Sequence, residues 1–393
     1  MVFRICIQKA VGFQIIFVTK NMVTKHSERL YGLDHLRALA IVLVLMYHYR
    51  AFKHPFWIDQ VGKFGWTGVD LFFVLSGFLI SGQLFREIEN KRDIRLRTFY
   101  TKRFFRIIPP FLFTLFLYFV FPFFRERESL PPLWKFVTFT QNYGLDVINQ
   151  GTFSHAWSLC IEEQFYLLFP LMLLVLRKGK IFRYMAVFMS ILIGFSVIIR
   201  WIMWNEFVVI SDQGSLDFWR VWYMKIYYPT HSRLDGLGVG VLTGYLMQYS
   251  SGIKNRVHHN GNLLFLMGIF LLGVSFWVCR EQASEEASII GFTLVALSYG
   301  VIVLSAVSES SFLYQWKSSV TSQLAMLSYT IYLSHKGIIH MMQNTLDYFD
   351  IQASGNGSLL ICLLACLVGG LFYRWGIEKP FARLKYRMLK EKK

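Results

Sequence analysis

The sequence predicts an all-α integral membrane protein of about ten transmembrane helices with no soluble domain. Three observations lead to this fold class. First, 54% of the 393 residues are apolar and 18% are aromatic, which is more than the roughly 45–50% apolar content of ordinary soluble domains. Second, apolar stretches of about 18 or more residues recur along the whole chain, and each is long enough to cross a bilayer. Third, no long polar region separates them.

Ten apolar segments are candidates for membrane-spanning helices. They lie near residues 33–51, 66–85, 107–124, 157–176, 182–203, 231–249, 262–279, 288–306, 322–343 and 357–376. We therefore expect one membrane domain over residues 31–380, a cytoplasmic arm over 1–30 and a basic cytoplasmic tail over 381–393. The arm holds only a short apolar run with no cleavage site after it, so we expect no signal peptide. Translation that begins at Met22 is the alternative.

The net charge of +17 suggests a nucleic-acid partner, but the distribution of the cations argues against one. Lys and Arg gather in alternate connections, above all in the arm, in residues 86–106 and in the tail from Lys379. The other connections hold fewer cations, and Arg200 is counted among these. By the positive-inside rule, both termini and residues 86–106 lie in the cytoplasm. We expect a multi-pass protein of the cytoplasmic (inner) membrane.

The first segment carries Arg37 near one end and His48 near the other. Eleven residues are about three helical turns, so both side chains fall on one helix face, roughly 16 Å apart along the axis. Each ionisable group costs roughly 2.5–3.5 kcal/mol at mid-bilayer on insertion scales, so such groups face an interior or a water-filled cavity. This pair therefore predicts a functional site.

The second segment begins at Gly65 and carries Asp70 and Ser76. Glycines in membrane helices let neighbouring backbones approach closely. Ser76 can bond within its own helix, and most intramembrane serines do only that. Asp70 is a candidate catalytic carboxylate, with simple solvation at the outer end of its span as the alternative.

Arg103 and Arg106 precede the third segment as neighbours at i and i+3. One interpretation is an interfacial anchor, with Phe104 and Phe105 turned towards lipid. The sharper one is a cytoplasmic phosphate site, because arginine grips phosphate oxygens bidentately. No glycine-rich phosphate loop accompanies the pair.

The fourth segment carries Glu162 and Glu163 one to two turns inside an apolar helix, where they point about 100° apart. Exposing both carboxylates to lipid would cost too much free energy, although one of them could reach the outer interface. The sixth segment begins with His231 and Asp235, which would share a helix face at i and i+4.

The ninth segment carries His335, which by itself is a weak candidate because lone interior histidines are usually structural. No spacing typical of metal ligands occurs, so we expect no metal. Taken together, the polar groups are expected towards the outer halves of the first, second, fourth and sixth spans, with Arg103 and Arg106 on the opposite, cytoplasmic side.

In order along the chain, these residues resemble the acyltransferase 3 family of membrane O-acyltransferases. The resemblance covers the chain from about Leu33 to Phe381. It rests on Leu33-Asp34-His35-Leu36-Arg37-Ala38-Leu39-Ala40 with His48, on Gly68 to Phe78, on Phe99-Tyr100 with Arg103 to Pro109, on Ser158 to Tyr166, on Ser328-Tyr329 to His335 and on Glu378-Lys379-Pro380-Phe381. One departure is His35, where the family more often has glycine.

The resemblance implies ten spans and an acyltransferase that takes acyl-CoA, usually acetyl-CoA, from the cytoplasm. The acyl group would pass to a hydroxyl of a carbohydrate on the outer side, such as O-antigen lipopolysaccharide, capsule, another surface glycan or peptidoglycan. Some relatives carry an esterase-like extracytoplasmic domain after the membrane part. Because this chain ends soon after Lys379, we expect that domain to be absent or on another protein.

The family's Arg-x10-His pair corresponds to Arg37 and His48, and its Arg-x-x-Arg motif to Arg103 and Arg106. His48 would be the general base for the acceptor hydroxyl, and Arg37 would guide the thioester arm or stabilise an oxyanion. The carboxylates that would orient His48 or bind the sugar are Glu162, Glu163 and Asp70. The cofactor-binding arginines for the CoA phosphates would be Arg103 and Arg106. The candidates for substrate binding are Arg233, Asp235, His335, Ser76 and Tyr166.

Two other classes of function remain open. A transporter or flippase would also carry intramembrane charges, but the two halves of the chain show no similarity of the kind that inverted repeats produce. A non-catalytic membrane assembly protein would explain the hydropathy but not so many interior ionisable groups.

Overall fold

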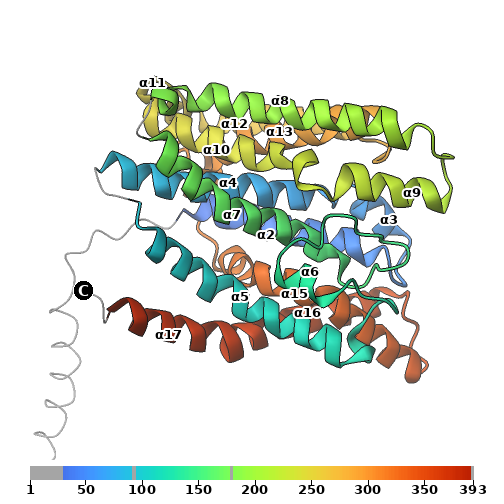
Figure 1. Ribbon diagram of the computed structural model, residues 1–393. Coiled ribbons are helices and arrows are strands. Elements are labelled where there is room, and N and C mark those ends of the chain that lie inside the picture. The colour runs from blue at the N-terminus through green and yellow to red at the C-terminus, as the bar shows by residue number, and fades with distance from the viewer. Residues whose placement is uncertain (1–29, 91–93, 178–179, 391–393) are drawn as a thin grey trace, which may run out of the picture. The chain divides into compact units, whose positions relative to one another are not determined.

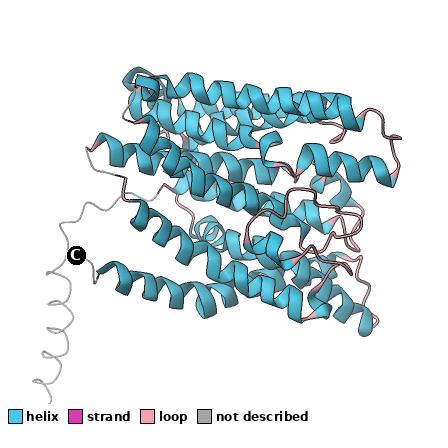
Figure 2. Cartoon of the chain, in the orientation of Figure 1, coloured by secondary structure: helices cyan, strands magenta, loops and turns pink. Residues whose placement is uncertain are grey.

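The computed structural model describes residues 30–90, 94–177 and 180–390. Every regular element within these ranges is a helix or a helical turn, as Figure 2 shows, so the predicted all-α class is confirmed. The predicted N-terminal arm, apart from Leu30, lies outside the described residues.

Each of the ten predicted segments overlaps one of the ten longest helices of the described residues. These helices are α2 (Tyr31–Tyr49), α4 (Thr67–Glu89), α5 (Leu96–Val120), α7 (Trp157–Leu176), α8 (Met185–Met203), α10 (Leu234–Tyr249), α12 (Gly261–Val278), α13 (Phe292–Ala306), α15 (Ser319–Tyr348) and α16 (Asn356–Tyr373). Shorter helices lie between them or at the end. They are α3 (Trp57–Gly62), α6 (Leu133–Val137), α9 (Leu216–Trp222), α11 (Ser251–His259), α14 (Phe312–Gln315) and α17 (Lys379–Lys390).

Seven helical stretches of the described residues are long and apolar enough to cross a membrane. They are Trp57–Glu89, Leu96–Val120, Ser154–Leu176, Phe182–Val208, Gly261–Val278, Ala287–Ala306 and Asn356–Lys390. Helices α2, α10 and α15 are not among them. Helix α10 has only 16 residues, and α2 and α15 carry polar and ionisable side chains along their length. The membrane class is thus supported, whereas the count of ten spans remains a prediction.

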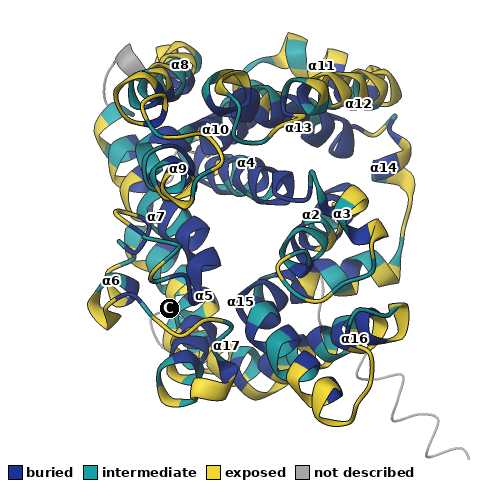
Figure 3. Cartoon of the chain, turned by 90° about the vertical axis from the view of Figure 1, so that its right-hand side faces the viewer, coloured by how far each residue is buried: buried dark blue, intermediate teal, exposed yellow. Residues whose placement is uncertain are grey.

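The long helices of residues 31–390 pack side by side, as Figure 1 shows. Helix α2 lies between α15 and α4, α4 packs against α10, and α10 packs against α8. Helix α13 covers α12, α10 and α4, while α16 packs on the far side of α15. Helix α7 contacts α4, and α5 contacts both α15 and α17. Buried residues turn towards the interior of this bundle and exposed residues outwards, as Figure 3 shows.

Glycines bring helices α4 and α10 into backbone contact. A Cβ added at Gly77 of α4 would collide with the carbonyl oxygen of Leu237, and one at Gly240 of α10 would collide with that of Val74. Small residues at such crossings let two helix backbones approach closely. The predicted role of glycine in the second segment is therefore confirmed at Gly77.

Three predicted boundaries shift. Helix α5 begins at Leu96, so Arg103 and Arg106 lie inside the helix rather than in a connection before it. Helix α10 begins at Leu234, after a 3₁₀ turn over Thr230–Ser232. Residues 379–390 of the predicted basic tail form helix α17.

Candidate active site

A cavity of about 310 Å³ lies between helices α2, α4, α5, α7 and α15. Its wall combines arginines, carboxylates, hydroxyl groups and apolar side chains. The polar and charged residues in this wall are Arg37, Ser76, Gln83, Arg86, Arg103, Arg106, Ser158, Glu162, Glu163, Tyr166, Ser328, Tyr329 and Tyr332. Seven of the predicted site residues thus meet at one place: Arg37, Ser76, Arg103, Arg106, Glu162, Glu163 and Tyr166.

Arginines from three helices supply the positive charge of the cavity. Arg37 comes from α2, Arg86 from α4, and Arg103 and Arg106 from α5. The Arg103 guanidinium lies over the ring of Tyr166, 5.2 Å from its centroid. Phe104, next to this pair, is 52% exposed and turns away from the bundle. The two interpretations of the Arg103–Arg106 segment are therefore compatible, because the arginines line a cavity while Phe104 faces outwards.

The carboxylate of Glu162 is held by two hydroxyl groups. Ser76 donates a hydrogen bond to its Oε2 at 3.1 Å, and the Tyr166 hydroxyl donates to the same oxygen. The Tyr166 hydroxyl also lies 3.0 Å from the Ser76 Oγ, so the three groups form a closed triangle across α4 and α7. The expected separation of Glu162 and Glu163 from the arginines is not found, because all of these groups line one cavity.

His48 belongs to a cluster of three histidines beside this cavity. Its Nδ1 lies 2.9 Å from the Nε2 of His335. The ring of His155 lies 4.8 Å from that of His335 and 5.8 Å from that of His48, between centroids. Orienting the His48 ring is one of the two roles expected for the carboxylates. The described hydrogen bonds of Glu162 and Asp70 go to other residues, and it is His335 that contacts the His48 ring.

A hydroxyl pair connects the histidine cluster to the cavity wall. The Tyr332 hydroxyl donates to the backbone carbonyl of His155 at 2.8 Å and lies 2.6 Å from the Ser158 Oγ. Tyr332 and Ser158 both line the cavity. Arg37 and His48 both belong to helix α2, with Arg37 about two turns after its start in the cavity wall and His48 near its end in the cluster. The predicted helix face therefore connects the two parts of the site.

His155 was not among the predicted site residues. It lies in the 3₁₀ turn Ser154–Ala156 before α7 and is 1% exposed. Only the packing of that turn against α15 brings it to His335, and no spacing along the sequence indicates this contact.

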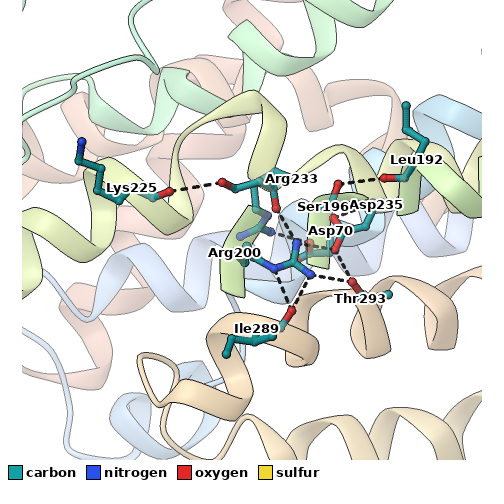
Figure 4. Close-up of polar contacts among 11 residues, drawn as sticks. Asp70, Leu192, Ser196, Arg200, Lys225, Arg233, Asp235, Ile289 and Thr293 are labelled. Atoms are coloured by element: carbon teal, nitrogen blue, oxygen red, sulfur yellow. Dashed lines mark hydrogen bonds and ion pairs between the residues drawn. The ribbon is translucent and has the colours of Figure 1, made fainter. Parts of the chain in front are cut away.

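Asp70, Arg233 and Asp235 lie in a buried ion-pair cluster, drawn in Figure 4, and do not line the cavity. Arg233 donates to Asp70 at 2.6 Å, and Arg200 donates to Asp235 at 2.9 Å. All four side chains are fully buried, so the solvated alternative for Asp70 is wrong. Thr293 of α13 also donates to Asp235.

Two further expectations fail at this cluster. Arg200 was counted with the connections, but it lies near the end of α8 and is fully buried. The signal that could have indicated a buried partner is the position of this arginine within an otherwise apolar segment. His231 precedes α10 instead of sharing a helix face with Asp235, and its ring stacks near Tyr143.

Comparison with known sequences identifies relatives. A family model described as an acyltransferase domain matches residues 30–375. The O-acetyltransferase OatA of Staphylococcus aureus strain NCTC 8325 / PS 47 is 26% identical over 389 residues, which cover 94% of this chain and 60% of that protein. OatA of Staphylococcus aureus strain COL matches with the same values. The chain thus spans 60% of the length of these relatives. No solved structure matches the chain.

Proposed function

The chain belongs to the acyltransferase 3 family, and on this premise we propose that it transfers an acyl group from cytoplasmic acyl-CoA to a carbohydrate hydroxyl. The acyl group is acetyl in the first instance, because the curated relatives are named O-acetyltransferases. The acceptor is a glycan on the outer side of the cytoplasmic membrane, such as O-antigen, capsule or another surface polysaccharide.

The observation that carries this proposal is the cavity that joins the arginines to the helix of His48. Arg103 and Arg106 bind the CoA phosphates, because guanidinium groups form paired, charge-assisted hydrogen bonds with phosphate oxygens. Arg37 lies on the same cavity wall and on the same helix as His48. Acyl-CoA is a long, thin molecule with phosphates at one end and a thioester at the other, so it suits a site in which the arginines and His48 lie apart.

The remaining cavity residues guide the arm between these two ends. Glu162, held by Ser76 and Tyr166, and Glu163 accept hydrogen bonds from amide N–H groups of the donor arm or from the acceptor hydroxyl groups. Their position among the arginines also prevents an excess of like charge in the bundle interior. Arg233, Asp235 and Asp70 lie outside the cavity wall, and their ion pairs hold helices together around this site.

His48 is the general base. Its neutral imidazole takes the proton of the acceptor hydroxyl, and the net reaction breaks the bond between the acyl carbon and the thioester sulfur. A bond forms between the acyl carbon and the acceptor oxygen, and the proton ends on the CoA thiol. Arg37 stabilises negative charge that develops on the acyl oxygen.

Acyl transfer by purified protein in lipid vesicles tests this proposal. Acyl-CoA is supplied on one side, and both CoA release and glycan ester are measured. His48→Ala should lower transfer by about 10²–10⁴-fold, because the hydroxyl loses its positioned base. His48→Gln should be nearly as inactive, because an amide cannot exchange the proton.

The matched control is His340→Ala on α15, since His340 contacts Asn344 and lies outside the cavity wall and the histidine cluster. Near-normal transfer by His48→Ala would refute the catalytic assignment. A wild-type protein that moves a solute across the vesicle membrane and never consumes acyl-CoA would favour the transporter instead.

A further inference from the structure

The hydrogen bond between His48 and His335 has a direction that the structure determines. The Nδ1 of His48 and the Nε2 of His335 are 2.9 Å apart, so one nitrogen donates and the other accepts. A neutral imidazole carries one N–H donor and one acceptor nitrogen, and the partner of one nitrogen decides which is which.

The other ring nitrogen of His335 shows which of the two histidines donates the hydrogen bond. Its Nδ1 lies 2.8 Å from the backbone carbonyl oxygen of Tyr332. A carbonyl oxygen only accepts, so the Nδ1 of His335 carries the hydrogen. The Nε2 of His335 is then the acceptor, and the Nδ1 of His48 must donate to it. It follows that the Nε2 of His48 carries the free lone pair.

The surroundings of His335 fix the orientation of its ring. The side chain is fully buried. The His155 ring packs edge-on against it at 4.8 Å, with its own Nε2 directed at the carbonyl of Leu333 at 3.3 Å. Two consecutive carbonyl groups of α15 therefore orient two imidazole rings.

We propose that His335 is a positioning residue that holds His48 in the tautomer whose Nε2 can accept a proton from the acceptor hydroxyl. This inference rests on the proposed function and adds the group that prepares the base for it. In many enzymes a carboxylate accepts a hydrogen bond from the catalytic histidine and so orients its ring. Here the acceptor that orients His48 is a neutral imidazole. When His48 takes the proton, its Nδ1–H remains bound to His335, so the charge stays on His48.

Two substitutions separate this role from simple packing. His335→Leu fills a similar space but offers no acceptor, and kcat should fall by about 10²-fold with little change in the KM for acyl-CoA. His335→Gln places an amide oxygen near the former Nε2, where it can accept from His48, so its kcat should be well above that of His335→Leu. His340→Leu, on the same helix and outside the cluster, is the matched control.

The tautomer of His48 is measured independently of activity. Solid-state ¹⁵N spectra of histidine-labelled protein in bilayers distinguish a protonated Nδ1 from a protonated Nε2, and the His48 signals are those lost in His48→Gln. The wild type should show His48 protonated at Nδ1, and His335→Leu should lose this preference. His48 protonated at Nε2 in the wild type would overturn the inference, as would equal kcat values for His335→Gln and His335→Leu.

These outcomes are separable from failure of the proposed function. If the wild type transfers no acyl group, the proposed function fails, and the spectra still decide the direction of the hydrogen bond. If the wild type transfers acyl groups but His335→Leu is as active as the wild type, only the positioning role is overturned.

Discussion

Two groups of arginines in or directly beside the long helices differ in their surroundings, and the difference predicts what each group does. Arg200 and Arg233 are fully buried and paired with carboxylates. Removal of one partner from such a pair leaves an uncompensated buried charge and costs about 3–5 kcal/mol of stability. Arg37, Arg103 and Arg106 instead line a cavity. We therefore assign the first group to the fold and the second to ligand binding.

Replacing Arg103 and Arg106 together by Ala should weaken donor binding and leave the protein inserted. A hydrogen bond to a charged group contributes about 1.5–3 kcal/mol, so loss of even one should raise the KM for acyl-CoA by roughly 10-fold or more. The double variant Arg95→Ala with Arg97→Ala is the matched control, because it removes the same charge from exposed positions outside the cavity wall.

An unchanged KM for the donor in the Arg103 and Arg106 variant would reduce the pair to an interfacial anchor. Loss of that variant from the membrane, with the control still inserted, would point to the same conclusion.

At the scale of elements, the interface of α4 and α10 organises one side of the bundle. The two helices touch through glycines, and the ion-pair cluster joins them to α8 and α13. Asp70 belongs to α4, Arg200 to α8, Asp235 to α10 and Thr293 to α13. Arg233, directly before α10, also lies 4.1 Å from the ring of Phe292, measured to its centroid. Apolar membrane helices gain little from hydrophobic burial against one another, so close backbone contact and polar bonds matter more.

Gly240→Ala should destabilise this interface. The new Cβ would press on the Val74 carbonyl of α4, and overpacking of this kind costs about 1–3 kcal/mol. The matched control is Gly273→Ala in α12, where a Cβ meets no atom within 4 Å. There the higher helix propensity of Ala should leave stability equal or slightly raised.

Thermal unfolding of the purified variants in the same detergent checks this difference. A melting temperature of Gly240→Ala that equals the value for Gly273→Ala would show that the two helices can move apart without cost.

For the whole molecule, the decisive prediction concerns the side of the membrane on which each end lies. In a variant without native cysteines, Arg95→Cys should be protected from a membrane-impermeant maleimide in intact cells. Gln352→Cys, in the connection between α15 and α16, should react. The physical reason is the excess of Lys and Arg in residues 86–106, the connection that contains Arg95, because cation-rich connections stay in the cytoplasm.

Reversed labelling, with Arg95→Cys reactive and Gln352→Cys protected, would contradict the topology. Acyl-CoA could then not reach Arg103 and Arg106 from the cytoplasm, so the direction of transfer in the proposed function would fail with it.

The helices could be predicted because the length of an apolar stretch is a local property of the chain. Each of the ten predicted segments forms a helix, and this includes α2 and α15 despite their polar residues. Helix ends depend on caps and neighbours rather than on hydropathy. This is why α5 extends back to Leu96 and α10 begins only at Leu234.

The candidate site was predictable in part for the same reason. Ionisable groups within apolar segments are costly and therefore visible, which singled out Arg37, His48, Glu162 and Glu163. Their partners were not visible, because contacts such as that of Ser76 with Glu162 join residues far apart along the chain. Arg200 is also an ionisable group within an apolar segment, but its position near the end of that segment made it resemble a residue of a connection.

By itself, the sequence determined the all-α class, the set of long apolar helices and a group of interior charges that required an enclosed environment. Only the tertiary structure decided how these charges divide. It placed Arg37, Arg103, Arg106, Glu162 and Glu163 around one cavity, and it buried Asp70 and Asp235 with Arg233 and Arg200 in a separate cluster. It also brought His155 and His335 to His48. Helix periodicity specifies which residues share a face, but the partner of that face is chosen by packing between helices, which no local pattern encodes.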